Sequence, residues 1–218
     1  MLVMLYHRYS LSLRDISEIL LYRNIEVSHE SIREWNKKFG SIIANNIGKK
    51  RSYIPGDKWH LDEMRVVIRR EVFWLWRAID NQGQELDILL QKRRNTKAAL
   101  RFFKKLLKRH NFIPKIIVTD KLRSYGSAKK SILKSSEHRK HKRLNNLIEN
   151  SHQPTRQRER QMRKFKDPVH TQRFLSSCSQ FLNLLKVNRY KFKASEYKNK
   201  MRLAFKLFNE AASQHYYV

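Results

Sequence analysis

Apolar residues recur at helical spacing along residues 11–39, first in LSLRDISEILLYRN and then in HESIREWNKKFG. We predict two short helices joined by a tight turn, with Ser28 as the N-cap of the second helix and Gly40 as its end. Two helices arranged in this way form a helix-turn-helix pattern, which is typical of DNA binding. We therefore expect a helix-turn-helix region over residues 1–45 and a polar, basic linker over residues 46–58.

Beyond the linker, the apolar positions change to the spacing of β-strands. WHLDEMRVVI, EVFWLWRAID and QELDILLQKR predict three consecutive strands with short turns between them. They precede a helix that Asn95 caps, a short apolar strand in KIIVTD, a helix near residues 122–133 and a basic helix from about Asn145. This β-β-β-α-β-α(-β)-α order predicts an α/β fold with an RNase H-like, retroviral-integrase-like catalytic core over residues 59–190. A C-terminal helix is expected within residues 191–218.

The charge of the chain narrows the choice of partners. Lys and Arg number 48 against 19 Asp and Glu, and the formal net charge of +29 favours a polyanion such as DNA or RNA. Composition alone favours a non-catalytic nucleic-acid-binding protein, such as a ribosomal or chromatin-like one. The single cysteine, Cys178, excludes an intrachain disulfide and a cysteine-based zinc site. No apolar run is long enough to span a bilayer, so we expect a cytoplasmic protein without a membrane partner.

Three acidic residues lie where a metal-dependent enzyme acting on polynucleotides needs them. Asp62 is inside the first predicted strand, Asp120 ends the strand in KIIVTD, and Glu149 is on the basic helix. Each alone has a common structural explanation: a solvent-facing strand residue, a strand-end cap, or an ion pair on a helix. Together they bring hard oxygen ligands to one site, which suits two Mg²⁺ or Mn²⁺ ions that promote displacement at phosphorus. Glu63 is expected to point to the other face of the strand.

Basic residues next to these acids are candidates for DNA contacts. His152 and Arg156 follow Glu149 at helical spacing, and Lys121 adjoins Asp120. We predict that His152 and Arg156 lie near the scissile phosphate, with solvated helix surface as the competing explanation. Lys121 is expected to contact a phosphate, with a structural role as the alternative. The segment RQRERQMRKFK predicts a basic face that follows the DNA backbone. The other predicted DNA-binding residues are Arg160 and, around the second helix of the helix-turn-helix, Ser28, His29, Ser31, Arg33 and Lys37.

These motifs, in this order, resemble the DDE transposases of the IS6 (IS26-like) family of insertion sequences. The resemblance covers almost the whole chain, from SLRDISEIL and VSHESIREWNKKFG through WHLDE and PKIIVTDKLRSYGSA to NNLIENSHQPTRQRERQMRKFKD. It implies that Asp62, Asp120 and Glu149 form a catalytic, metal-binding triad. It also implies binding to the terminal inverted repeats of an element, joining of the element ends to target DNA, and a bacterial protein that is nucleoid-associated when bound to DNA. Because two DNA ends must be brought together, a homodimer or higher oligomer is expected.

The chain departs from the family pattern in two places. It starts at the middle of the family's first helix, so we expect a shortened N-terminal DNA-binding region. The interval between Asp120 and Glu149 is also shorter than is typical of the family. Two other interpretations stay open: a catalytically inactive, transposase-derived DNA-binding protein, and an RNase H-fold nuclease that cleaves DNA without joining it.

Overall fold

The computed structural model describes residues 1–120, 122–140 and 146–213. They divide into two units, one over Ile54–Gln172 and one that combines Met1–Tyr53 with the residues from Arg173 onward. The unit boundary near residue 172 falls inside a helix.

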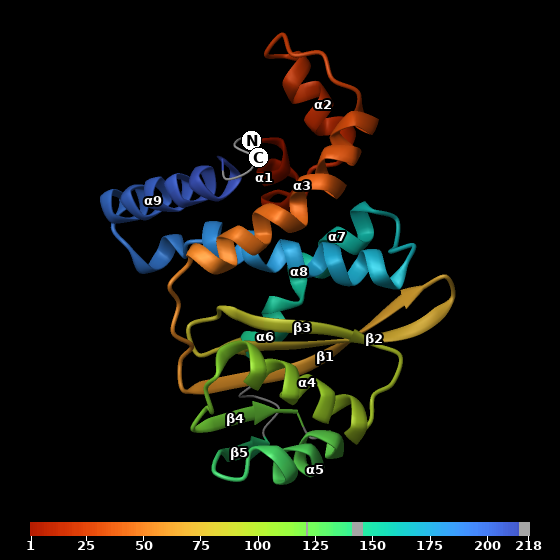
Figure 1. The fold of residues 1–218 in the computed structure, drawn as a ribbon, viewed down its shortest axis with the longest axis vertical. Helices are drawn as coiled ribbons and strands as arrows, with labels where there is room; N and C mark the ends of the chain where they lie inside the picture. The colour runs from red at the N-terminus through yellow and green to blue at the C-terminus, as the bar shows by residue number, and fades with distance from the viewer. Residues whose placement is uncertain (121, 141–145, 214–218) are drawn as a thin grey trace. The chain divides into compact units, whose positions relative to one another are not determined.

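In the described part of the Ile54–Gln172 unit, five strands form a single sheet in the order β3-β2-β1-β4-β5 (Figure 1). The strands β1 and β2 pair antiparallel, as do β2 and β3, whereas β1 pairs parallel with β4 and β4 with β5. These pairings and the α/β order confirm the predicted RNase H-like core. The strand bounds are β1 (Lys58–Ile68), β2 (Glu71–Asp80), β3 (Glu85–Gln91), β4 (Ile116–Thr119) and β5 (Glu137–Lys140).

The long β1–β2 hairpin sets the register of the sheet. Arg69 and Arg70 make its two-residue turn with φ values of 50° and 67°, the left-handed conformation that tight hairpin turns require at both positions. In the resulting register Asp62 lies opposite Arg77, and Glu63 lies opposite Trp76. Residues directly opposite each other share a face of the sheet, so Asp62 lies on the face of Arg77 and Glu63 on the face of Trp76.

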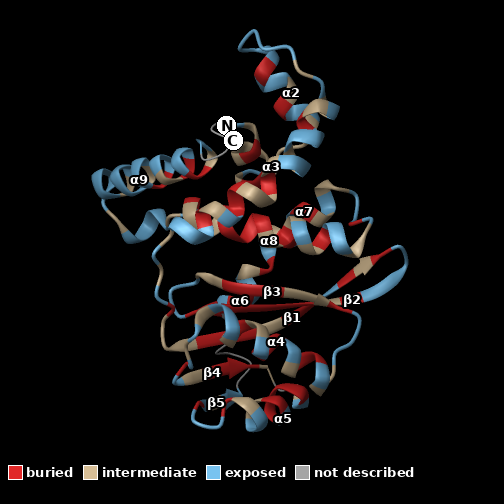
Figure 2. Cartoon of the chain, viewed as in Figure 1, coloured by how far each residue is buried: buried red, intermediate tan, exposed pale blue. Residues whose placement is uncertain are grey.

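Helices cover both faces of this sheet, and its strands are largely buried (Figure 2). The helices α4 (Thr96–His110) and α5 (Arg123–Ile132) lie on the face to which Trp76 points, because the Trp76 ring packs against Phe102 of α4 and Tyr125 of α5. Asn95 caps α4 as predicted, its Oδ1 accepting from the backbone N–H of Ala98 at 3.0 Å. The helices α6 (Asn146–Ser151) and α7 (Gln153–Gln161) contact the opposite face.

The predicted basic helix from about Asn145 is present, but it is divided at His152 into α6 and α7. Pro154 lies in the first turn of α7 and has no N–H to continue the hydrogen-bond ladder of α6, which explains the break. Helix α7 then ends at Gln161, and Arg163 and Lys164 adopt positive φ values of 49° and 71°. The predicted basic face of RQRERQMRKFK is therefore helical only in its first half.

The other unit consists of helices and one short 3₁₀ turn among its described residues. Its elements are α1 (Leu2–Arg8), α2 (Leu13–Leu21), α3 (His29–Lys50), the part of α8 (Pro168–Leu185) from Arg173, η2 (Arg189–Lys191) and α9 (Ala194–Ser213). Ser28 caps α3 as predicted, its Oγ accepting from the N–H of Ser31 at 3.1 Å. Helix α9 confirms the expected C-terminal helix.

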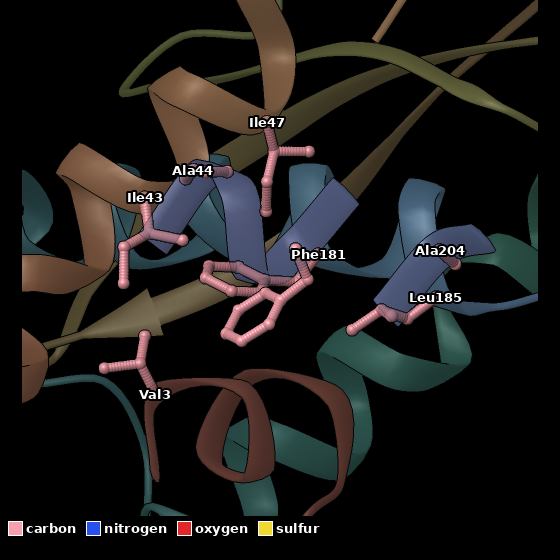
Figure 3. Packing of buried hydrophobic residues seen from close by; sticks show 9 residues of the cluster. Val3, Ile43, Ala44, Ile47, Phe181, Leu185 and Ala204 are labelled. Atoms are coloured by element: carbon pink, nitrogen blue, oxygen red, sulfur yellow. The ribbon is translucent and has the colours of Figure 1, made fainter. Parts of the chain in front are cut away.

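Gly40 does not end α3, which continues ten residues further to Lys50 and enters the segment that we predicted as a linker. Gly40 is buried in the helix instead, where an added Cβ would lie 3.1 Å from His7 Nε2 of α1. The glycine thus allows a close approach of two helices. The helix continues because its next turns are buried in an apolar cluster, in which side chains of α1, α3, α8 and α9 gather around Phe181 (Figure 3).

Candidate active site and metal centre

The carboxylates of Asp62, Glu63 and Asp120 meet at the edge of β1 where β4 ends. Parallel pairing between these strands stops at Leu61 and Thr119, so within the described residues no strand pairs with the next residues of β1 on that side. Asp120 follows β4 directly and turns into this gap. Within the described part of the chain, these three side chains offer oxygen atoms that all lie within 4.8 Å of one another.

Asp62 and Glu63 reach this edge from opposite faces of β1. Asp62 shares its face with Arg77 and is partly exposed, whereas Glu63 shares the face of Trp76 and its side chain has no solvent exposure. The expectation that Glu63 points to the other face was correct, but no sequence pattern indicated that its carboxylate belongs to the site. A Glu side chain is long enough to turn around a strand edge that lacks a paired neighbour.

One arginine holds two of the three carboxylates. Arg94, in the loop between β3 and α4, is paired closely with Glu63 Oε1, and its Nη2 lies 3.4 Å from Asp120 Oδ2. The guanidinium also lies over the Trp74 ring, 4.8 Å from its centroid. A planar guanidinium can bridge two carboxylates and stack on an aromatic face at the same time.

Burial changes the acid strength of Glu63 and of its neighbour Tyr125. Removal from water and, second, the Asp120 charge raise the pKa of Glu63 to about 7, although Tyr125 and Arg94 oppose the rise. Burial also raises the pKa of Tyr125 well above its ordinary value, and the nearby Glu63 charge adds to that shift. Glu63 can therefore carry a proton near neutral pH when no cation other than Arg94 is close.

On the other face, His152 connects Asp62 to the helices. The Nε2 of His152 lies 3.1 Å from Asp62 Oδ2, and its Nδ1 lies 3.4 Å from Arg77 Nη1. A guanidinium can only donate, so Nδ1 accepts and the Nε2 proton points to Asp62. His152 is buried between α6 and α7, which excludes the alternative that it is solvated helix surface.

Arg77 fixes the junction of these two helices to the sheet. It is buried on β2, its Nη2 donates to Thr155 Oγ1 at 2.6 Å, Nη1 donates to the Ser151 carbonyl, and Nε lies 2.8 Å from Glu85 Oε2. A single buried cation therefore contacts the last residue of α6 and the first turn of α7. These contacts tie both helices to β2.

Glu149 lies on α6, one helical turn before His152, and its side chain is exposed. It lines a surface hollow together with His152, Gln153, Arg156, Gln157 and Arg160. Its carboxylate does not belong to the group formed by the other acids among the described residues. The structure thus brings Asp62 and Asp120 together with Glu63 and leaves Glu149 on the adjoining helix.

The donor set at the sheet edge fits a divalent metal ion. All three clustered side chains are carboxylates, and hard oxygen donors of this kind suit Mg²⁺ and Mn²⁺. Asp62 and Asp120 would hold such an ion with Glu149 or Glu63 as a further ligand.

Comparison with known proteins agrees with this geometry. Residues 56–188 match the family model described as the DDE domain. The transposase for insertion sequence-like element IS431mec of Staphylococcus aureus strain N315 is 38% identical over 152 residues, which cover 67% of each protein. The S. aureus transposase for IS257 in transposon Tn4003 has the same identity and coverage. The chain belongs to the IS6 family of DDE transposases.

A solved structure of the HTLV-2 integrase catalytic core domain in complex with magnesium aligns with this transposase at a TM-score of 0.47. It shares 14% sequence identity and covers 66% of this chain and 94% of that one. Family membership makes the protein an enzyme of DNA transposition and favours this function over the two alternatives, a non-catalytic DNA-binding protein and an RNase H-fold nuclease.

The predicted DNA-binding residues of the transposase lie in separate places. Arg156 and Arg160 are exposed on α7, where Arg156 Nη1 lies 3.2 Å from Glu159. Lys121 lies outside the described residues. His152 lies at the junction of α6 and α7, as described above, and the remaining five lie at the start and on the exposed side of α3. There Ser28 and Ser31 hydrogen-bond to each other, His29 and Arg33 contact Glu30, and Lys37 contacts Glu34.

No helix in the described part of the transposase combines the length and the hydrophobicity needed to cross a bilayer. Cys178 is a buried thiol in α8, as expected, and its Sγ lies 3.2 Å from His7 Nδ1.

Proposed function

We propose that this transposase cleaves DNA at the ends of its insertion sequence and joins them to target DNA, with Asp62, Asp120 and Glu149 as catalytic carboxylates. The observation that carries the proposal is the meeting of Asp62 and Asp120 at the free edge of β1, within 4.8 Å of each other. Glu149 is proposed as the third member because its helix is fixed beside Asp62 through His152 and Arg77.

The carboxylates would bind Mg²⁺ or Mn²⁺, and two ions are proposed. Divalent ions at such a site activate a water or a 3′-hydroxyl and stabilise the leaving 3′-oxygen during displacement at phosphorus. The protein's own residues position the reactants. His152 donates to Asp62 and holds that carboxylate in orientation. Arg156 and Arg160 line the hollow beside Glu149 and are proposed to bind the phosphates that flank the cleaved bond.

The other unit would recognise the DNA ends. We propose that α3, with Ser28, His29, Ser31, Arg33 and Lys37, binds the terminal inverted repeats as the second helix of a helix-turn-helix. Strand transfer of two ends by one assembly requires a homodimer or a higher oligomer. Activity on bacterial DNA would place the protein in the cytoplasm, associated with the nucleoid when bound.

A cleavage and strand-transfer assay on oligonucleotides that carry the element's ends tests the proposal. With Mn²⁺ or Mg²⁺, Asp62→Asn and Asp120→Asn should lower the rate on the order of a thousandfold, because each loses a metal-binding charge. Asp57→Asn is the matched control, since Asp57 is a half-exposed acid beside β1 that pairs with Lys115. Full activity of either site variant would refute the assignment.

A further inference from the structure

Arg94 takes a position in the carboxylate cluster that the proposed metal chemistry does not use. It reaches the site from the loop that precedes α4, and its guanidinium contacts both Glu63 and Asp120. Three carboxylate groups with oxygens within 4.8 Å repel one another strongly unless a cation lies among them. Arg94 supplies such a charge from the protein itself.

The two contacts of Arg94 differ in strength. The contact with Glu63 is close, and the Glu63 side chain has no exposure to solvent. The contact with Asp120 is long, at 3.4 Å, and 31% of the Asp120 side chain is exposed, so water screens it. A competing cation would therefore break the Asp120 contact first and leave Arg94 attached to Glu63.

We propose that Arg94 is a built-in counter-cation of the carboxylate cluster and that a divalent metal ion must displace it from Asp120 in order to bind. The inference rests on the proposed metal-binding role of Asp62 and Asp120. Arg94 is a positioning residue in this scheme: it holds the acids together in the metal-free protein and weakens metal binding by competing for Asp120. The Trp74 ring, 4.8 Å from the guanidinium, provides a surface on which the released arginine can stay.

Calorimetric titration of the purified transposase with Mn²⁺, in the absence of DNA, tests this competition. Arg94→Gln should bind Mn²⁺ about five to ten times more tightly than the wild type, because a positive charge next to the ligands is removed. Arg93→Gln is the matched control: it removes the same charge from an exposed neighbour in the same loop and should leave the dissociation constant within about twofold of the wild type. The increase in thermal unfolding temperature caused by Mn²⁺ should follow the same order.

Arg94→Lys provides a second variant if Arg94→Gln does not fold. Lysine keeps the charge as a compact ammonium but lacks the planar, forked donor geometry with which a guanidinium bridges two carboxylates. Its Mn²⁺ affinity should lie between those of the wild type and Arg94→Gln. Equal or weaker Mn²⁺ binding by the folded Arg94 variants, with clear binding by the wild type, would overturn the inference and leave the proposed function intact. No Mn²⁺ binding by any of these proteins would overturn both.

Discussion

The neighbouring acids Asp62 and Glu63 lie on opposite faces of β1 and have different surroundings. Asp62 faces a polar network, in which His152 donates to it and buried Arg77 lies opposite it across the strand pair. Glu63 faces aromatic side chains, Trp76 and Tyr125, and has an arginine as its ion partner. Hydrogen-bond donors hold a carboxylate in place directly, whereas an apolar wall holds it by packing and disfavours its charge.

One site is thus assembled from side chains on both faces of a sheet. Successive side chains of a strand point to opposite faces, so Asp62 and Glu63 start from different sides of the sheet. Their carboxylates can converge because β4 ends at Thr119 and the edge of β1 after Leu61 is open. The polar face fixes the helix that carries Glu149, and the apolar face fixes Glu63. The division predicts separate roles: chemistry depends on the polar face, and the charge balance of the site depends on the apolar one.

The rate of strand transfer should depend much more strongly on Glu149 than on Glu63. Glu149→Gln should lower strand transfer on the order of a thousandfold, because it removes a proposed metal ligand. Glu63→Gln should lower it on the order of tenfold, since Arg94 loses its charged partner but the triad remains. Both are measured as single-turnover rates on the same DNA ends, with Glu71→Gln, an exposed acid paired with Lys92, as control.

An equal loss of strand-transfer activity in the Glu63 and Glu149 variants would contradict these separate roles. It would make Glu63 a metal ligand with the same importance as Asp62 and Asp120, consistent with its place in the carboxylate group. A loss confined to the Glu63 variant would exchange the roles of the two residues.

The second prediction concerns the free energy of unfolding and tests the role of Arg77 on the polar face of β1. Arg77→Met should lower the free energy of unfolding by about 3 to 5 kcal/mol, because Glu85 loses its buried ion partner and Thr155 and the Ser151 carbonyl lose a donor. Denaturant unfolding monitored by circular dichroism measures this change. Arg65→Met, an exposed arginine on β1, should change stability by less than about 0.5 kcal/mol. Similar values for both variants would show that the junction of α6 and α7 is held without Arg77.

Much of this site follows from sequence patterns, and the exceptions have physical causes. Asp62 and Asp120 were predictable because a charged residue inside or directly after an apolar strand is visible as a pattern. The role of Glu63 was not, because it depends on where pairing with β4 stops, and no local pattern gives the length of a strand pair. Pro154 did signal a break in the helix after Glu149, and that signal was available in the sequence. Gly40 was misread because a glycine at a helix end and one under a crossing helix look alike in sequence.

The smallest predicted effect is the pH dependence of the free energy of unfolding of the metal-free protein, and it tests the apolar surroundings of Glu63. Unfolded chains release the Glu63 proton near its ordinary pKa of 4.5, whereas the folded protein retains it to about pH 7. Between these values the folded state binds more protons, so the free energy of unfolding falls as the pH rises. The loss across this window should be at most about 3 kcal/mol.

Glu63→Gln isolates this contribution, because glutamine keeps the shape of the side chain and cannot titrate. With a chelator present, denaturant unfolding of the wild type at pH 5 and pH 8 should show the decrease, and the variant should show a smaller one. If the two proteins lose stability in parallel, the pH dependence comes from other groups, and Glu63 is charged in the folded protein at pH 5 already. The apolar face would then stabilise a carboxylate through Arg94, as the polar face does for Asp62 through His152, and the two faces would differ only in which cation or donor they use.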